Sequence, residues 1–201
     1  MAQTPRVMRP TTRSHAWRFC RALFDWAAVS GIVAGLGCAA GSGAATEPPP
    51  LRTVERVELD RYLGTWFEIA SYPQRFQKDC TATKAEYSLL DDGEIRVENS
   101  CRKHTLDGKP DVARGRARVV DRVTNAKLEV SFFRPFWGDY WVIDLGADYE
   151  YAVVGHPSRE YLWVLSRTPS LDTVVYDGIL ERLVAQGYDT SRLRRTLQPA
   201  G

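Results

Sequence analysis

Apolar and polar residues alternate with a period of two through most of the chain between Gly64 and Ser166. Such alternation is typical of β-strands that bury one face. The predicted strands cover residues 64–71, 84–89, 95–98, 114–119, 127–132, 140–145, 151–155 and 161–166. No helical pattern separates them, so we expect eight antiparallel strands in meander order. Strands of this number and order close into an up-and-down β-barrel that is wide enough for one small ligand.

A single amphipathic helix is predicted after the last of these strands. Ser170 is a candidate N-cap, and apolar residues then recur on one helical face until Gly187, which favours a helix end. The face consists of Leu171, Val175, Ile179 and Leu183. We expect this all-β fold to carry one C-terminal α-helix on the outside of the barrel. A short edge strand is predicted over residues 193–197, and a one-turn helix over 60–62.

The first 37 residues have the features of a signal peptide. Five arginines lie before the apolar segment 26–37, which is too short to span a bilayer. Cys38 follows at once, and this order resembles the lipobox of bacterial lipoproteins, in which the cysteine is acylated and becomes the N-terminus. Gly35 departs from that motif. Two alternatives stay open, namely ordinary cleavage near residues 43–45 and an uncleaved anchor.

Residues 38–53 form a predicted linker rich in Gly, Ala and Pro, and residues 54–199 form one predicted domain. The net charge of +2 is misleading, because five of the 27 basic residues precede Cys38. The remainder has 22 basic and 24 acidic residues and no basic stripe. This distribution argues against nucleic acid as a partner.

Two cysteines, Cys80 and Cys101, belong to the predicted domain. In an exported protein, such an isolated pair is most simply a disulfide. A metal site would need further ligands, and neither His104 nor His156 stands at a suitable spacing. The meander order places both cysteines on the open rim of the barrel. We expect neither a metal nor another cofactor.

Three local motifs give the chain a family resemblance. Gly64-Thr65-Trp66 lies on the first strand, Asp148-x-x-Tyr151 precedes the seventh, and Arg167 ends the eighth. In this order the motifs resemble those of lipocalins, and residues 57–199 are similar to the bacterial outer-membrane lipocalins and apolipoprotein D. The resemblance implies binding of fatty acids or lysophospholipids, for lipid storage or transport in envelope maintenance. It implies an outer-membrane lipoprotein facing the periplasm, or alternatively a soluble periplasmic or secreted protein, and it leaves a homodimer open.

The motif residues Gly64, Trp66, Asp148, Tyr151 and Arg167 are expected to be structural. The first and eighth strands meet at one end of the meander, so Trp66 and Arg167 are predicted neighbours. A guanidinium over an indole face contributes roughly 0.5–2 kcal/mol. The pair would close the base of the barrel without touching the ligand.

The predicted ligand-binding residues are the inward-facing positions of the strands. They are Ala85, Tyr87, Ile95, Val97, Ala117, Val119, Leu128, Val130, Phe132, Trp141 and Trp163. The small residues among them argue against a completely filled core. Haem, a pigment or a signal molecule remain alternative ligands.

No catalytic residue is predicted, because the chain has no nucleophile elbow, HExxH pair or phosphate loop. Glu68 has the same parity as Trp66 and is a candidate for an inward carboxyl group of raised pKa. Such a group more often pairs with a nearby Arg or hydroxyl, so a lipid-modifying enzyme is the weaker alternative.

The predicted loop 133–138 carries three aromatic residues, Phe133, Phe136 and Trp137, although it belongs to the open rim. Two interpretations are open. The rings pack inward and fill the mouth of the barrel, or they contact a membrane surface, where Trp is favoured and Arg134 would attract anionic headgroups.

Overall fold

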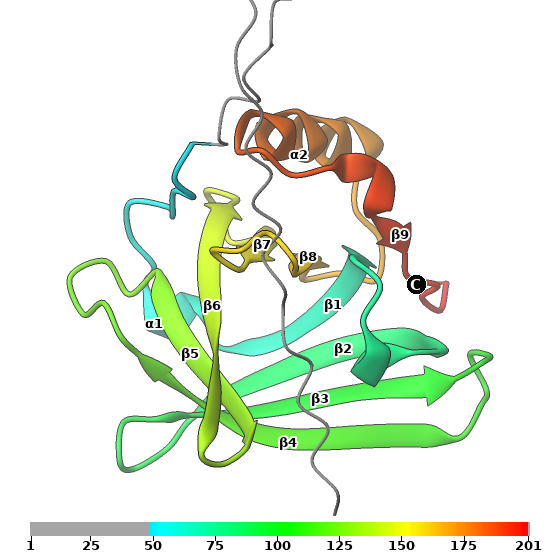
Figure 1. Ribbon diagram of the computed structural model, residues 1–201. Helices are drawn as coiled ribbons and strands as arrows, with labels where there is room; N and C mark the ends of the chain where they lie inside the picture. The colour runs from blue at the N-terminus through cyan, green and yellow to red at the C-terminus, as the bar shows by residue number, and fades with distance from the viewer. Residues whose placement is uncertain (1–48, 201) are drawn as a thin grey trace, which may run out of the picture. The chain divides into compact units, whose positions relative to one another are not determined.

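The computed structural model describes residues 49–200, which form a closed antiparallel β-barrel (Figure 1). Its strands are β1 (Gly64–Ser71), β2 (Cys80–Leu89), β3 (Ile95–Lys103), β4 (Pro110–Val119), β5 (Lys127–Phe133), β6 (Phe136–Leu145), β7 (Tyr151–Gly155) and β8 (Leu162–Ser166). From β1 to β8, each strand pairs with the next strand in sequence, and β1 pairs with β8 as well as with β2. This double pairing closes the barrel, so the predicted fold class is confirmed.

A ninth strand, β9 (Arg194–Arg195), pairs with Ala70 and Ser71 of β1. It lies within the edge segment predicted over residues 193–197. The predicted one-turn helix is also present as α1 (Leu59–Tyr62), directly before β1. Two short 3₁₀ helices, η1 (Arg75–Gln77) and η2 (Thr190–Arg192), complete the elements.

The C-terminal helix α2 (Thr173–Ala185) begins later than predicted. Its N-cap is Asp172, whose carboxylate accepts hydrogen bonds from the backbone N–H groups of Val174 and Val175 at 2.8 and 3.2 Å. Ser170 precedes the helix, and its carbonyl oxygen accepts from the Thr168 hydroxyl instead. Gly187 has a φ of +82° just after the helix, as its predicted role requires.

Helix α2 lies on the outside of the barrel (Figure 1). It buries Ile179 and Leu183, as predicted, and also Tyr176. These side chains pack with a cluster on the outer face of β1, β6, β7 and β8 that includes Val153 and Val164. The helix therefore stabilises the wall of the barrel from outside and leaves its interior to other residues.

Two rim connections are shorter than the sequence suggested. Strand β3 continues to Lys103 and β4 begins at Pro110, whereas the predicted strands ended at residue 98 and began at residue 114. Strands β5 and β6 are joined by Arg134 and Pro135 alone, so the predicted loop 133–138 is a tight hairpin. The Phe133 and Phe136 rings stack across this hairpin with centroids 6.3 Å apart, which favours extended backbone up to the turn.

The described end of the predicted linker contacts the domain. Leu51 packs beside the cluster beneath α2, and the backbone N–H of Arg52 donates to Gln186 at 3.1 Å. The predicted signal peptide and Cys38 lie outside the described residues. Within residues 49–200, no helix has the length and hydropathy that a membrane span requires.

Candidate functional site

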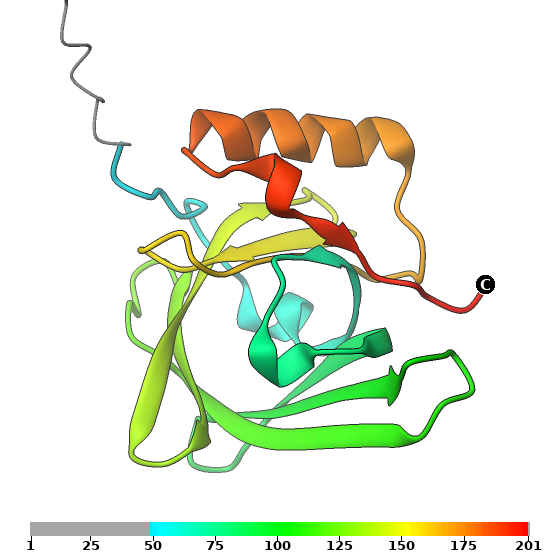
Figure 2. The same ribbon diagram turned by 45° about the vertical axis from the view of Figure 1, so that its right-hand side comes forward.

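The barrel encloses a cavity of about 630 Å³. Its mouth lies at the end where β1–β2, β3–β4, β5–β6 and β7–β8 are connected, since exposed or half-buried residues near these connections belong to its lining. Figure 2 shows the barrel as a ring of strands with the β1–β2 connection and η1 crossing the opening. Phe76 and Gln77 of η1 contribute to the lining there. A volume of this size is within the usual range for ligand pockets.

Nine of the eleven predicted ligand-binding residues line this cavity. They are Ala85, Tyr87, Ile95, Val97, Ala117, Leu128, Val130, Phe132 and Trp163. The alternation in the sequence placed them on the inner face correctly, and the small side chains of Ala85 and Ala117 leave the room that a filled core would lack. Leu59, Leu63, Val154 and Leu165 add further apolar surface.

Val119 and Trp141 are corrections to the predicted lining. Val119 points inward but packs against the core below the cavity, because β4 reaches the closed end there. Trp141 lies on the outer face of β6, beside the cluster under α2 and with Lys127 Nζ 4.3 Å from its ring centroid. Tyr140 and Val142 take the inward positions. In a strand, an error of one residue exchanges the two faces.

The closed end of the barrel is sealed by Trp66 and Arg167, the predicted neighbours. The Arg167 guanidinium lies 3.7 Å from the centroid of the Trp66 ring, which is fully buried. The Trp66 indole donates to the carbonyl oxygen of Tyr62 at 2.8 Å, and Arg167 donates to those of Thr65 and Arg61. Gly64 has a φ of +91°, which side chains disfavour. Trp66 is absent from the cavity lining.

The second motif makes the turn between β6 and β7. Tyr151 lies on the outer face, where its hydroxyl accepts from Arg182 of α2 at 3.0 Å. It thereby joins the helix to the barrel. The Asp148 side chain is exposed, and the backbone N–H of Asp148 donates to the Glu150 carboxylate at 3.1 Å.

Three tyrosine hydroxyls meet at the floor of the cavity. Tyr140 Oη lies 2.8 Å from Tyr62 Oη and 3.0 Å from Tyr87 Oη. The Tyr62 ring packs against Trp66, with centroids 5.1 Å apart, so this tyrosine floor rests on the seal of the barrel. Burial raises the pKa of Tyr87 to about 12 and the pKa values of Tyr62 and Tyr140 further. All three phenols are therefore neutral at physiological pH.

The mouth is more polar than the interior. Cys80 and Cys101 form the predicted disulfide there, which joins β2 to β3 beside the cavity. Asp139 lies 3.6 Å from His156, and Asp111 pairs with Lys103 at 3.1 Å. The four side chains remain partly exposed, so the mouth suits a polar group that stays in water.

Glu68 faces inward near the mouth and is 4% exposed. Its carboxylate accepts hydrogen bonds from Ser71, Gln77 and Thr196. Burial raises the pKa of Glu68, and these hydrogen bonds oppose the shift. The group is paired with hydroxyls and an amide, as the non-catalytic interpretation expected, and it ties η1 and the C-terminal segment to β1.

Sequence reasoning missed several residues of the interior. Besides Tyr62 and Tyr140, they include Thr83 and Asn99, which line the cavity on β2 and β3. Thr83 lies two residues from Ala85, and Asn99 lies two residues from Val97, so each faces the same side of its strand as a residue that was predicted to line the cavity. The apolar alternation ends before both positions, so they could have been found only by extending the inward-facing pattern further along each strand.

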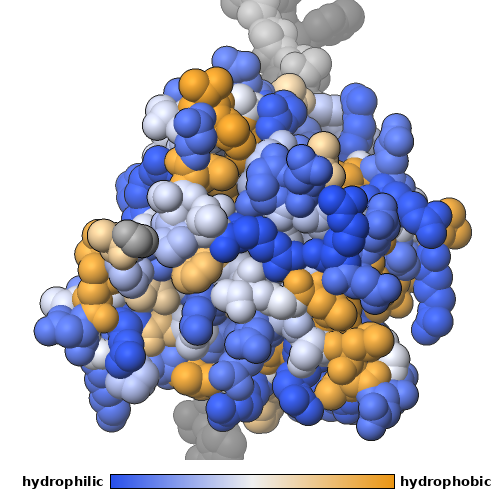
Figure 3. Space-filling model, turned by 180° about the vertical axis from the view of Figure 1, so that it is seen from behind, coloured by the Kyte–Doolittle hydropathy of each residue, from blue (hydrophilic) through white to orange (hydrophobic). Residues whose placement is uncertain are grey.

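The outer surface of the barrel is mostly charged and hydrophilic, in contrast to the apolar interior. Arginines and carboxylates face each other across neighbouring strands, as in Arg114–Glu98 at 2.8 Å and Arg118–Glu129 at 2.7 Å. Figure 3 shows a mostly hydrophilic face with small, separate hydrophobic areas. In the part of the chain that the structure describes, no group of His, Cys, Asp and Glu could hold a metal ion.

Comparisons with known proteins agree with this geometry. Residues 57–198 match the model of the lipocalin-like domain family. Temperature-induced lipocalin-1 of Arabidopsis thaliana is 40% identical over 162 residues, covering 76% of this chain and 86% of its own. Outer membrane lipoprotein Blc of Escherichia coli K12 is 39% identical over 155 residues, covering 77% and 86%. Insecticyanin from Manduca sexta shares the fold with a TM-score of 0.60 and 23% identity, covering 75% and 85%.

Proposed function

Since the chain belongs to the lipocalin family, whose members bind hydrophobic ligands, we propose that its barrel holds the acyl chain of a fatty acid or lysophospholipid. The observation that carries this proposal is the cavity of about 630 Å³ with its largely apolar wall. Each buried methylene contributes roughly 0.8 kcal/mol, so a long chain gains affinity along the whole depth of the barrel. The headgroup stays at the polar mouth, near Asp139 and His156.

The cavity serves binding and not catalysis in this proposal. Glu68, the buried carboxyl group of the interior, is held by three hydrogen bonds from side chains of the chain itself. The barrel would then store lipid or carry it within the cell envelope, as a monomer or a homodimer.

A titration with a fluorescent fatty acid tests the proposal. The probe should bind one site per barrel with an emission shift typical of an apolar environment. Unlabelled fatty acid and lysophospholipid should displace it competitively. If neither competes at concentrations below micelle formation, the acyl-binding proposal is wrong.

We also propose that Cys38 is acylated and holds the protein at the outer membrane. Two observations support this proposal, namely the lipobox-like order of residues 26–38 and the similarity to a protein named outer membrane lipoprotein. Replacement of Cys38 by Ser should move the protein from the membrane to the soluble periplasmic fraction. A wild-type protein that already fractionates as soluble would leave only the export proposal standing.

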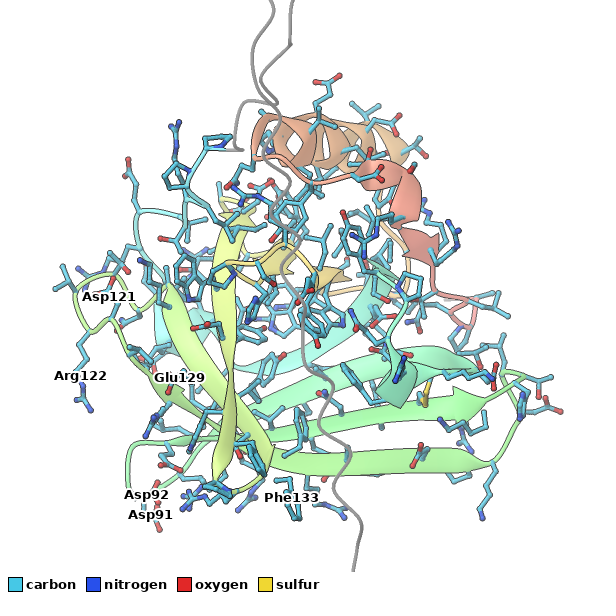
Figure 4. All side chains as sticks on the ribbon, in the orientation of Figure 1. Asp91, Asp92, Asp121, Arg122, Glu129 and Phe133 are labelled. Carbon is cyan, nitrogen blue, oxygen red and sulfur yellow. A yellow bond between two sulfur atoms is a disulfide. The ribbon has the colours of Figure 1, made fainter. Side chains whose placement is uncertain are left out.

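The aromatic tip, which we define as Phe133 and Phe136 of the β5–β6 hairpin, favours membrane contact. The two side chains are 75% and 70% exposed, so they do not fill the mouth. Figure 4 shows Phe133 pointing away from the barrel. The preceding residue, Phe132, lines the cavity, so the aromatic tip is continuous with the route of the ligand. We propose that the tip contacts the lipid surface from which ligand is exchanged.

Trp137 is not part of the aromatic tip, because its ring is covered by Arg118, whose guanidinium lies 4.3 Å from the ring centroid. The variant to test is therefore Phe133→Ser with Phe136→Ser, in protein that starts after the leader. Binding to phosphatidylcholine vesicles that contain phosphatidylglycerol should fall about tenfold or more, because two exposed aromatic anchors are lost. Affinity for a soluble lysophospholipid should change little. Loss of that affinity with unchanged vesicle binding would place the rings in the pocket.

A further inference from the structure

The hydroxyl groups of the tyrosine floor have one proton more than the hydrogen bonds among them can use. Tyr62, Tyr87 and Tyr140 carry three hydroxyl protons, and the two contacts through Tyr140 use two of them. No other hydrogen bond to these hydroxyls exists within residues 49–200. Whichever way the three hydroxyls are oriented, one of their protons has no acceptor among them. Because the phenols stay neutral, the proton is retained at physiological pH.

The side chains that carry this donor border the ligand space. All three tyrosines line the cavity, and Tyr62 and Tyr87 are 3% and 8% exposed. A buried donor without a partner is unfavourable, and native proteins rarely leave one. The floor is therefore suited to receive an acceptor atom from whatever occupies the barrel.

The wall above the floor provides a second, independent observation. Thr83 Oγ1 and Asn99 Oδ1 are buried, and neither has a hydrogen-bond partner in the described part of the chain. Both side chains line the same cavity, on the paired strands β2 and β3. A barrel that holds only saturated hydrocarbon would gain nothing from these polar atoms. They indicate a ligand that carries a hydroxyl group in the part buried in the barrel, because Asn99 Oδ1 needs a donor.

The charge near the tyrosine floor determines whether a neutral oxygen or an ionised carboxylate of the ligand can bind there. The nearby guanidinium of Arg167 is separated from the cavity by the Trp66 ring, and it donates to the carbonyl oxygens of Thr65 and Arg61. One phenolic proton does not replace the hydration of an ionised carboxylate. The carboxylate of a fatty acid therefore belongs at the mouth, and the floor fits a neutral acceptor.

We propose that the tyrosine floor is a subsite for a neutral oxygen at the inner end of the ligand, of the kind found in an ω-hydroxylated fatty acid. This inference rests on the proposed acyl binding and defines its ligand class more narrowly. The ligand hydroxyl oxygen accepts a hydrogen bond from the free phenolic O–H, and the ligand O–H donates to a phenol oxygen of the floor or to water.

The test measures the Kd of ω-hydroxylated fatty acids of increasing chain length, each against its unsubstituted parent, with wild-type protein. The hydroxylated acid should bind about tenfold more tightly at the length that brings its oxygen to the floor. Shorter acids should gain no affinity from the hydroxyl group. If the parent acid binds as tightly at every length, a water or nothing occupies the floor, and the inference is wrong although acyl binding stands.

A variant locates the preference. Tyr62→Phe with Tyr87→Phe and Tyr140→Phe keeps the three rings and removes every hydroxyl, so it should reverse the preference toward the parent acid. Tyr176→Phe is the matched control, because Tyr176 lies on α2 outside the barrel. If the triple variant keeps the preference, the floor is not the subsite. If the triple variant does not fold, the chain-length series with wild-type protein decides alone. If neither acid binds, acyl binding itself fails.

Discussion

Replacement of Trp66 by Ala should lower the free energy of unfolding by about 3–5 kcal/mol, the usual range for a large aromatic residue removed from a core. The ring is fully buried between Arg167 and Tyr62, and its indole N–H bonds the Tyr62 carbonyl oxygen. The substitution leaves a cavity and removes that hydrogen bond. Equilibrium denaturation in urea measures the loss. Ligand preference among the surviving folded molecules should not change.

Trp137→Ala is the matched control for this prediction. Trp137 also stacks with an arginine, since Arg118 lies 4.3 Å from its ring centroid, but it lies on the outer wall and is only partly buried. Its removal should change the unfolding free energy by about 1 kcal/mol or less. In a double-mutant cycle, Trp66→Ala and Arg167→Ala should be non-additive because the two side chains touch. Strict additivity would contradict the role of the pair as one seal.

A large side chain placed inside the barrel should reduce its affinity for ligand. Ala85→Trp should weaken binding of a long-chain fatty acid about a hundredfold. Ala85 lines the cavity, and the indole would displace roughly four methylenes of ligand, worth about 3 kcal/mol in total. Stability should be retained, because the new ring enters free space. Displacement of a fluorescent fatty acid gives the affinity, and a thermal melt shows that the variant is folded.

Glu86→Trp provides the comparison on the same strand. Glu86 is exposed on the outer face of β2, next to Ala85. Its replacement should leave fatty acid affinity unchanged. Equal losses for both variants would mean that the added ring acts through the strand and not through the space inside the barrel.

The sequence was sufficient to predict the barrel because each strand repeats one simple rule. One residue faces the core and the next faces water, so Ala85, Val97 and Val130 could be placed on the wall without further information. The seal was also predictable, since meander order alone brings Trp66 and Arg167 to the same end.

The alternation rule failed where both faces of a strand are apolar. The segment around Trp141 is apolar on both faces, because α2 covers the outer one, and its parity was therefore assigned wrongly. Tyr62 lies in α1 and not in a strand, so no alternation could connect it with Tyr87 and Tyr140. The tyrosine floor exists only through contacts between elements distant in sequence.

Native mass spectrometry of the protein, extracted from membranes in a mild detergent, identifies what the barrel holds. We expect a non-covalent adduct that is released on activation and has the mass of a fatty acid or lysophospholipid. The Ala85→Trp variant should lack this adduct. A haem or pigment mass on wild-type protein, or an acyl adduct retained by Ala85→Trp, would contradict the claim that this cavity binds an acyl chain.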